Sequence, residues 1–382
     1  MVNINRLNDQ CITFSQMNII FNVRNFWKEL ATWTRDYLFS RYSGIGNEQE
    51  SFAYLYSVPA NYTNMLRLIY GVQFSERYLD LFNEHITILR DMVSAQLEGN
   101  IEAIKQNVTR LSKNADSIAE FLASYNPFFD RNKIRELLTI YNQYIIDMAN
   151  SFSTGEFSKV LETYDQLLIH TETIGDYLSQ GLSSLITNVN PQNNNQTTQQ
   201  CITYSQMLDI FNIRNFWFEM AAWTRAYFIS RYTGIGATEE SYRRLNRTVE
   251  DYVARLRPFF GDKITDEYLQ LLYTHNSLIA SLISAQLEGN TDAAGNITMQ
   301  LYQNADERAK YLSSINPFWE ENELRNRLYR YTQSTLEEMT TFLRRDFARN
   351  TDIFKRLLTQ SESTGDYFSQ GLFNYISQSK GQ

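Results

Sequence analysis

The second half of this chain repeats the first half. The segment CITFSQMNIIFNVRNFW, which begins at Cys11, returns as CITYSQMLDIFNIRNFW at Cys201, an offset of 190 residues (201 minus 11). SAQLEGN recurs at 94–100 and 284–290, and NPF recurs at 126–128 and 316–318, so no insertion or deletion is needed. A solenoid repeat spans only a few tens of residues, so this period predicts the duplication of a whole domain. We expect one domain at 1–187, a polar linker at 188–200 and a second domain at 201–382.

Each repeat has the pattern of a helical domain. The chain contains only 15 Gly and 5 Pro, too few for the many turns of a β-sandwich or barrel. Apolar residues recur at helical spacing between clear stop signals, of which SGIG at 43–46 ends the first helix. Later helices are predicted at about Ser75–Glu98, Ile101–Tyr125, Asn132–Phe152 and Glu156–Ile186.

The segment after the first helix differs between the two copies. Val58-Pro59 interrupts it in the first copy, whereas its counterpart at 241–260 has an uninterrupted helical pattern. Five or six helices per repeat, joined by short loops, predict antiparallel packing. The predicted fold is therefore all-α, with two tandem antiparallel helical bundles that each have a core like that of a four-helix bundle.

Composition and charge narrow the classes of partner. Hydrophobic residues make up 43% and charged residues 20%, which is typical of a folded chain with a sizeable core. The net charge is −8 with both signs interspersed and no basic stripe, so no nucleic-acid partner is expected. No run of about 18 apolar residues occurs, so we expect no transmembrane segment. Two cysteines and an N-terminus without a signal-peptide pattern predict a cytoplasmic location.

Polar residues on apolar helix faces are the candidates for a metal site. Glu29 and its copy Glu219 fall on the apolar stripe of the first helix, and His85 and its copy His275 fall on that of a later helix. His170 could complete a set with Glu29 and His85 in the first repeat only. One interpretation is a metal or small-ligand site inside a bundle that is ferritin-like in architecture only. The other is a hydrogen-bonded core pair, and it is favoured because no Glu-x-x-His motif occurs.

Four further residues are candidates for a buried polar network. Arg35 and Arg225 stand in the two WTR triplets, and we expect each to pair with a carboxylate or to cap a helix end. Tyr141 and Tyr331 fall within apolar helices, where a tyrosine most simply donates a hydrogen bond inside the core.

The order of motifs in each repeat resembles a group of uncharacterised bacterial helical-bundle proteins. The motifs are W-x5-W-T-R, a His on a later helix, N-A-D-x-I-A-x-F-L and N-P. In the first repeat these are Trp27 to Arg35, His85, Asn114 to Leu122 and Asn126-Pro127. The second repeat matches at Trp217 to Arg225, His275, Asn304-Ala-Asp306 and Asn316-Pro317. The resemblance implies an all-helical fold and no particular activity.

No enzyme motif accompanies the repeats. The chain has no Gly-rich phosphate loop, no G-x-S-x-G, no Cys-x-x-Cys and no H-E-x-x-H. We therefore expect a non-enzymatic structural or interaction protein, with a protein partner or self-association of its two repeats. A metal- or small-ligand-binding bundle is one alternative, although no cofactor can be named. A carrier of apolar ligands is another, suggested by 25 Tyr and 24 Phe.

Overall fold

The protein is helical throughout the residues that its computed structural model describes, 12–189 and 202–379. These residues form twelve helices and no strand, which confirms the all-α prediction. The first six are α2 (Phe14–Ser43), α3 (Glu48–Tyr70), α4 (Val72–Leu97), α5 (Ile101–Tyr125), α6 (Arg131–Thr154) and α7 (Phe157–Val189). The other six are α8 (Tyr204–Thr233), α9 (Thr238–Phe260), α10 (Asp262–Leu287), α11 (Thr291–Ile315), α12 (Glu321–Leu343) and α13 (Phe347–Ser379). None of them combines the length and the apolar character that a membrane span needs.

The chain divides into two compact units. The N-terminal unit is Ser15–Thr198, and the C-terminal unit is Gln199–Gln382 together with Met1–Phe14. Within the C-terminal unit Ile12 and Ile202 form an isolated antiparallel bridge, in which each N–H donates to the other's carbonyl at 3.0 and 3.1 Å. Cys11 and Cys201 lie outside the described residues, as does the predicted linker from residue 190 onward. The first two positions of that linker, 188 and 189, belong to α7.

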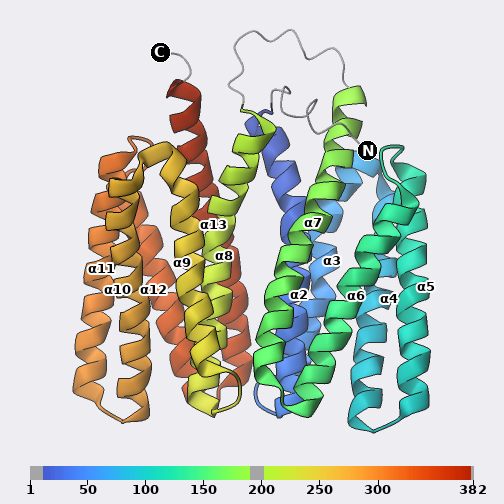
Figure 1. The fold of residues 1–382 in the computed structure, drawn as a ribbon, viewed down its shortest axis with the longest axis horizontal. Helices are drawn as coiled ribbons and strands as arrows, with labels where there is room; N and C mark the ends of the chain where they lie inside the picture. Colours follow the sequence, from blue (N-terminus) through green and yellow to red (C-terminus); the bar gives the residue numbers. More distant parts are fainter. Residues whose placement is uncertain (1–11, 190–201, 380–382) are drawn as a thin grey trace. The chain divides into compact units, whose positions relative to one another are not determined.

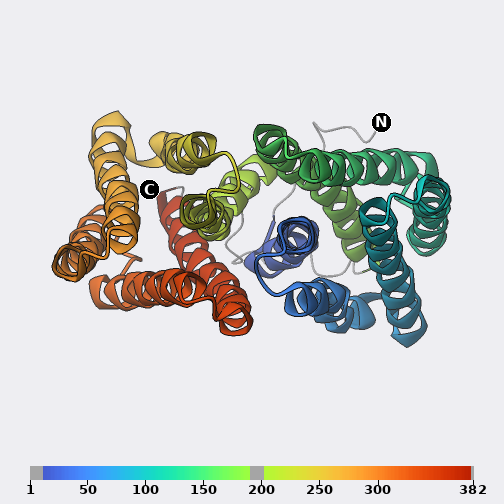
Figure 2. The same cartoon turned by 90° about the horizontal axis from the view of Figure 1, so that it is seen from below.

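Helices that follow one another in the chain also pack against one another. In the C-terminal unit α8 contacts α9, α10, α12 and α13, and each of α9 to α12 contacts the next helix. The same succession joins α3 to α7 in the N-terminal unit (Figure 1). Figure 2 shows the helices of each unit obliquely, from below. Short loops with local caps make this possible: Asp130, for example, accepts hydrogen bonds from two backbone N–H groups at the start of α6.

The expected interruption at Val58-Pro59 is absent, because α3 runs through it without a break. Proline removes one helical hydrogen bond and crowds the preceding turn, which disfavours a helix in isolation. Here Leu55, Val58 and Leu66 are buried against the bundle, and such packing supplies most of a helix's stability in a protein. The second repeat accommodates Pro258 inside α9 in the same manner.

In each repeat one glycine lets the first and last helices approach closely. A methyl group at Gly365 of α13 would overlap the backbone oxygen of Arg214 on α8, and one at Gly175 of α7 would overlap Arg24 on α2. Since an α-helix cannot move its own backbone aside, these positions require a residue without Cβ.

We predict opposite effects for two Gly→Ala substitutions in the C-terminal unit. Gly365→Ala is expected to lower the free energy of unfolding by about 1–3 kcal/mol or more, because the helices must separate. Gly295→Ala, inside α11 with open space around it, is expected to raise it by about 0.5–1 kcal/mol, because Ala restricts the unfolded chain. Urea unfolding measures both. Equal effects of the two substitutions would contradict the close crossing.

Candidate functional site

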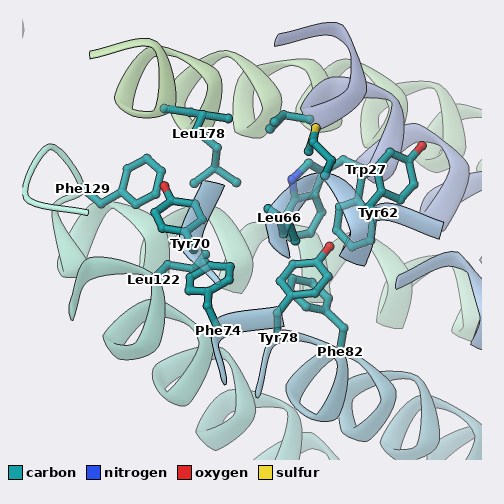
Figure 3. Close-up of a pocket in the computed structure, with 14 residues that line it drawn as sticks. Trp27, Tyr62, Leu66, Tyr70, Phe74, Tyr78, Phe82, Leu122, Phe129 and Leu178 are labelled. Carbon is teal, nitrogen blue, oxygen red and sulfur yellow. The ribbon is translucent and has the colours of Figure 1, made fainter. Parts of the chain in front are cut away.

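The N-terminal unit contains a pocket with a cavity of about 60 Å³. Its walls come from α2, α3, α4, α5 and α7 and from the loop between α5 and α6, and aromatic rings dominate them (Figure 3). The lining includes Trp27, Tyr62, Leu66, Tyr70, Phe74, Tyr78, Phe82, Leu122, Phe129 and Leu178. None of these side chains is charged, so the pocket suits an apolar molecule.

Helical spacing places three of these rings along one wall. Phe74, Tyr78 and Phe82 stand four residues apart on α4, and side chains at that spacing share a helix face. Tyr78 and Phe82 have ring centroids 4.6 Å apart, and Phe82 meets Phe26 of α2 edge to face at 5.0 Å. The wall is therefore held by ring-to-ring contacts within the core.

Two tyrosine hydroxyls of the lining have protein partners. Tyr62 donates to Oε2 of Glu29 at 3.1 Å, and Tyr70 accepts from Nδ2 of Asn126 at 3.1 Å. Burial raises the pKa of Tyr70 to about 12 and that of Tyr78 well above its usual value, so both rings stay neutral. Tyr70 and Tyr78 therefore bring no charge to the pocket.

Phe129 lies at one end of the pocket, directly against α7. A methyl group at Gly181 would overlap its ring, so the glycine makes room for the phenylalanine. The loop that carries Phe129 is attached to α7 through Asp130, whose N–H donates to the Tyr177 hydroxyl at 2.7 Å. Phe129 itself is only partly buried.

Two lining positions correspond to larger side chains in the C-terminal unit, whereas Phe74 and Phe82 correspond to the smaller Ile264 and Leu272. Phe129 corresponds to Trp319, and Leu178 corresponds to Phe368. Trp319 donates from Nε1 to the backbone oxygen of Phe368 at 3.2 Å, and their ring centroids are 5.2 Å apart. Both residues are at most 1% exposed. The second repeat thus places packed rings where the first repeat has its pocket.

The helix ends beside the pocket also differ between the repeats. In the N-terminal unit Leu68 is 89% exposed and Val72 is 43% exposed. Pro258 and Asp262 take these places in the C-terminal unit, where Arg257 pairs with Asp262 at 2.9 Å. One repeat therefore exposes apolar side chains here, and the other exposes an ion pair.

The structure places the predicted metal-binding residues of the first repeat in separate surroundings. Glu29 accepts the Tyr62 hydrogen bond, whereas His85 is buried beside Asn114. Burial lowers the pKa of His85 to about 4, so the imidazole is neutral. His170 is half-buried, and its Nε2 lies 2.8 Å from the carbonyl oxygen of Leu137.

Their copies in the second repeat have other neighbours. Glu219 accepts from Nδ2 of Asn215 at 2.6 Å and faces Arg244 at 3.9 Å. His275 is buried, with Nδ1 3.5 Å from Nη2 of Arg308. Across the described residues, no group of three or more His, Cys, Asp or Glu side chains is arranged to hold a metal ion.

The predicted buried network takes different forms in the two units. Arg225 donates to Oε1 of Glu338 at 2.5 Å and to Oδ1 of Asn350 at 2.8 Å, and all three are buried. In the first repeat Met148 stands where Glu338 does, and the guanidinium of Arg35 lies 5.1 Å from the centre of the Tyr164 ring. Arg225 makes the equivalent cation–π contact, 4.4 Å from the centre of the Phe354 ring, so both arginines lie over a ring and the second repeat adds the buried carboxylate Glu338.

The two network tyrosines occupy matching positions in the units. Tyr141 and Tyr331 are at most 1% exposed, and burial raises the pKa of each hydroxyl far above its usual value. Tyr141 lies beside Thr34 and Tyr331 beside Thr224, and both rings pack edge to face on a tryptophan, Trp27 in the first unit. These tyrosines are core residues near the histidines and stay protonated.

Sequence reasoning missed Glu338 and the pocket lining. Glu338 could have been noticed, because it is a carboxylate on an apolar helix face at a position where the first repeat has Met148. The pocket had no local signal apart from the abundance of aromatic residues. Its lining comes from segments spread between Val23 and Leu182, and only the folded chain brings them together.

Comparison of the chain with known protein families, with curated proteins and with solved structures found no match. The geometry of the two units is therefore the basis for function. A half-open apolar pocket can bind and orient a molecule, and the side chains that line this one are uncharged.

We predict that Glu338→Met, alone, lowers the free energy of unfolding by about 3–5 kcal/mol, because it leaves a buried guanidinium without its carboxylate. The double substitution Arg225→Met with Glu338→Met is expected to recover most of this loss. Chemical unfolding of the four proteins of this cycle measures the coupling. Purely additive losses would show that the pair is not coupled.

We predict a pH-dependent stability from His85. The unfolded side chain titrates near pH 6.5 and the folded one near 4, so stability falls as the pH decreases between these values, by about 3 kcal/mol in total. Urea unfolding between pH 7.5 and 4.5 should show a steeper pH dependence for the wild type than for His85→Gln. Carboxylates contribute alike to both proteins, so identical slopes would count against a neutral buried His85.

Proposed function

We propose that this chain is a tandem pair of helical bundles that binds a small apolar molecule in its N-terminal unit. One observation carries the proposal: an aromatic pocket in the first repeat coincides with positions that Trp319 and Phe368 fill in the second. At these two positions the first repeat has the smaller side chains and keeps a pocket, whereas in the second repeat the larger rings are packed in the core.

The pocket's size and lining define the class of ligand. A closed apolar cavity of about 150 Å³ accepts benzene, so a cavity of about 60 Å³ accepts a smaller group unless a wall moves. We therefore propose a ligand with a short apolar or aromatic end that enters between Trp27, Phe74 and Phe129. The rest of the ligand would extend over exposed apolar side chains such as Leu68 and Val72. Apolar area removed from water contributes roughly 25 cal/mol per Å² to such binding.

Binding, rather than catalysis or metal storage, follows from what the site offers. The lining is uncharged, and the predicted metal-binding residues do not gather into a set of three in the described residues. Glu29 is engaged by Tyr62, and His85 is buried and neutral. The proposed role is therefore that of a non-enzymatic carrier or sensor of apolar ligands.

The proposal predicts that exchanging two residues between the repeats changes the number of binding sites. Phe129→Trp with Leu178→Phe is expected to fill the pocket and abolish binding. The reverse exchange, Trp319→Phe with Phe368→Leu, is expected to open a second site in the C-terminal unit. Calorimetric titration with short straight-chain alcohols, whose alkyl chains are thinner than a benzene ring, measures the stoichiometry, expected to be one for the wild type, none for the filled variant and two for the opened variant.

Circular dichroism spectra and unfolding curves of the three proteins serve as the control for folding. An alcohol that binds the filled variant as tightly as the wild type would overturn the proposal. Failure of the wild type to bind any alcohol of the series would do so as well.

A further inference from the structure

The C-terminal unit buries an arginine that has no carboxylate partner in the part of the chain that the structure describes. Arg308 of α11 is 1% exposed. Its Nη2 lies 3.5 Å from Nδ1 of His275, and its buried Nε has no hydrogen-bond acceptor among the described residues. The first repeat has Ile118 at this position, so the fold does not need a cation there.

The groups around Arg308 are two tyrosine hydroxyls, each able to donate one hydrogen bond. Tyr252 and Tyr268 are 3% and 1% exposed, and both hydroxyls interact electrostatically with the guanidinium. The Tyr252 hydroxyl is directed at that of Tyr268, and among the described atoms neither has a hydrogen-bond partner outside this pair. The buried carboxylate of the same unit, Glu338, is bound to Arg225 instead.

Such a cluster is costly in an empty core. A guanidinium stays protonated in proteins, and taking an unpaired ion out of water costs several kcal/mol. Each buried donor without an acceptor adds a further cost of about 1–3 kcal/mol. An acceptor that carries one negative charge would satisfy the arginine Nε and the Tyr268 hydroxyl together.

We infer that Arg308, Tyr252 and Tyr268 form a binding site for a small monovalent anion. The anion must be small, because the three side chains and His275 are all at most 3% exposed. It must carry one charge, because the site holds one cation: burial and the neighbouring Arg308 lower the pKa of His275 well below its usual value, which keeps that ring neutral. A halide such as chloride fits both conditions.

This site is independent of the apolar pocket. Arg308 belongs to α11 of the C-terminal unit, whereas every residue that lines the pocket belongs to the N-terminal unit. The first repeat keeps His85, Tyr62 and Tyr78 at the equivalent positions but has no cation, and there Tyr62 donates to Glu29 instead. The substitution of Ile118 by Arg308 is therefore the step that would create the anion site.

The test compares chloride with gluconate, a monovalent anion too large for the site, at constant ionic strength in the full chain. We expect the unfolding temperature of the wild type to rise by a few degrees, saturably, as chloride replaces gluconate. Arg308→Met should remove this difference. Tyr268→Phe, which keeps the charge but removes one donor, should raise the chloride concentration needed for half of the effect several-fold.

A second measurement does not depend on any variant. Crystals of the wild type soaked in sodium bromide should show an anomalous scattering peak within hydrogen-bond distance of Arg308 Nε, and no such peak beside Ile118. A wild-type unfolding temperature that is the same in chloride and gluconate would overturn the inference. A chloride effect that persists unchanged in Arg308→Met, or bromide crystals without a peak at Arg308, would overturn it too.

Discussion

The close contact between the first and last helices of each repeat is the constraint on which the rest of the structure depends. In the C-terminal unit Arg214 of α8 donates to Asp366 of α13 at 2.5 Å, across 152 positions of sequence. Arg24 of α2 and Asp176 of α7 form the same ion pair in the N-terminal unit, and Gly365 and Gly175 give each arginine room. Closing so long a segment of chain costs conformational entropy, which the contacts of this crossing and the packing beside it must offset. The pocket depends on this crossing, because α2 and α7 contribute to its walls.

The two repeats show how one helical framework accepts different interiors. Phe129 and Leu178 leave space where Trp319 and Phe368 fill it. Met148 occupies the place of the buried Glu338, and the surrounding helices keep their lengths to within one residue. Cores tolerate such exchanges when volume and polarity are balanced by neighbours, as Arg225 balances Glu338. The two proposed ligand sites, the apolar pocket and Arg308, lie where this balance is incomplete.

Individual elements show how far sequence reasoning reaches in this protein. The helix predicted at Ile101–Tyr125 has those bounds in the structure, because Asn100 caps its start and Asn126-Pro127 ends it. The expected break at Pro59 is absent, since buried neighbours outweigh the local cost of proline. Glu29 and His85 each fall on the apolar face of their own helix in the sequence, but the structure gives them different partners, Tyr62 and Asn114. Helical spacing predicts the face on which a residue lies, and not which helix packs against that face.

The sequence by itself determined that the chain is all-helical, where most helices begin and end, and that two halves share one pattern. These properties depend on local signals, namely caps, breakers and the spacing of apolar residues, which act within a few positions. Only the tertiary structure decided that aromatic side chains between Val23 and Leu182 line one pocket, and that Arg308 is buried among tyrosines with no carboxylate partner among the described residues. Both depend on how side chains from distant helices fill a shared volume, and a difference of a few atoms, such as Phe129 against Trp319, changes that filling without changing the helical pattern.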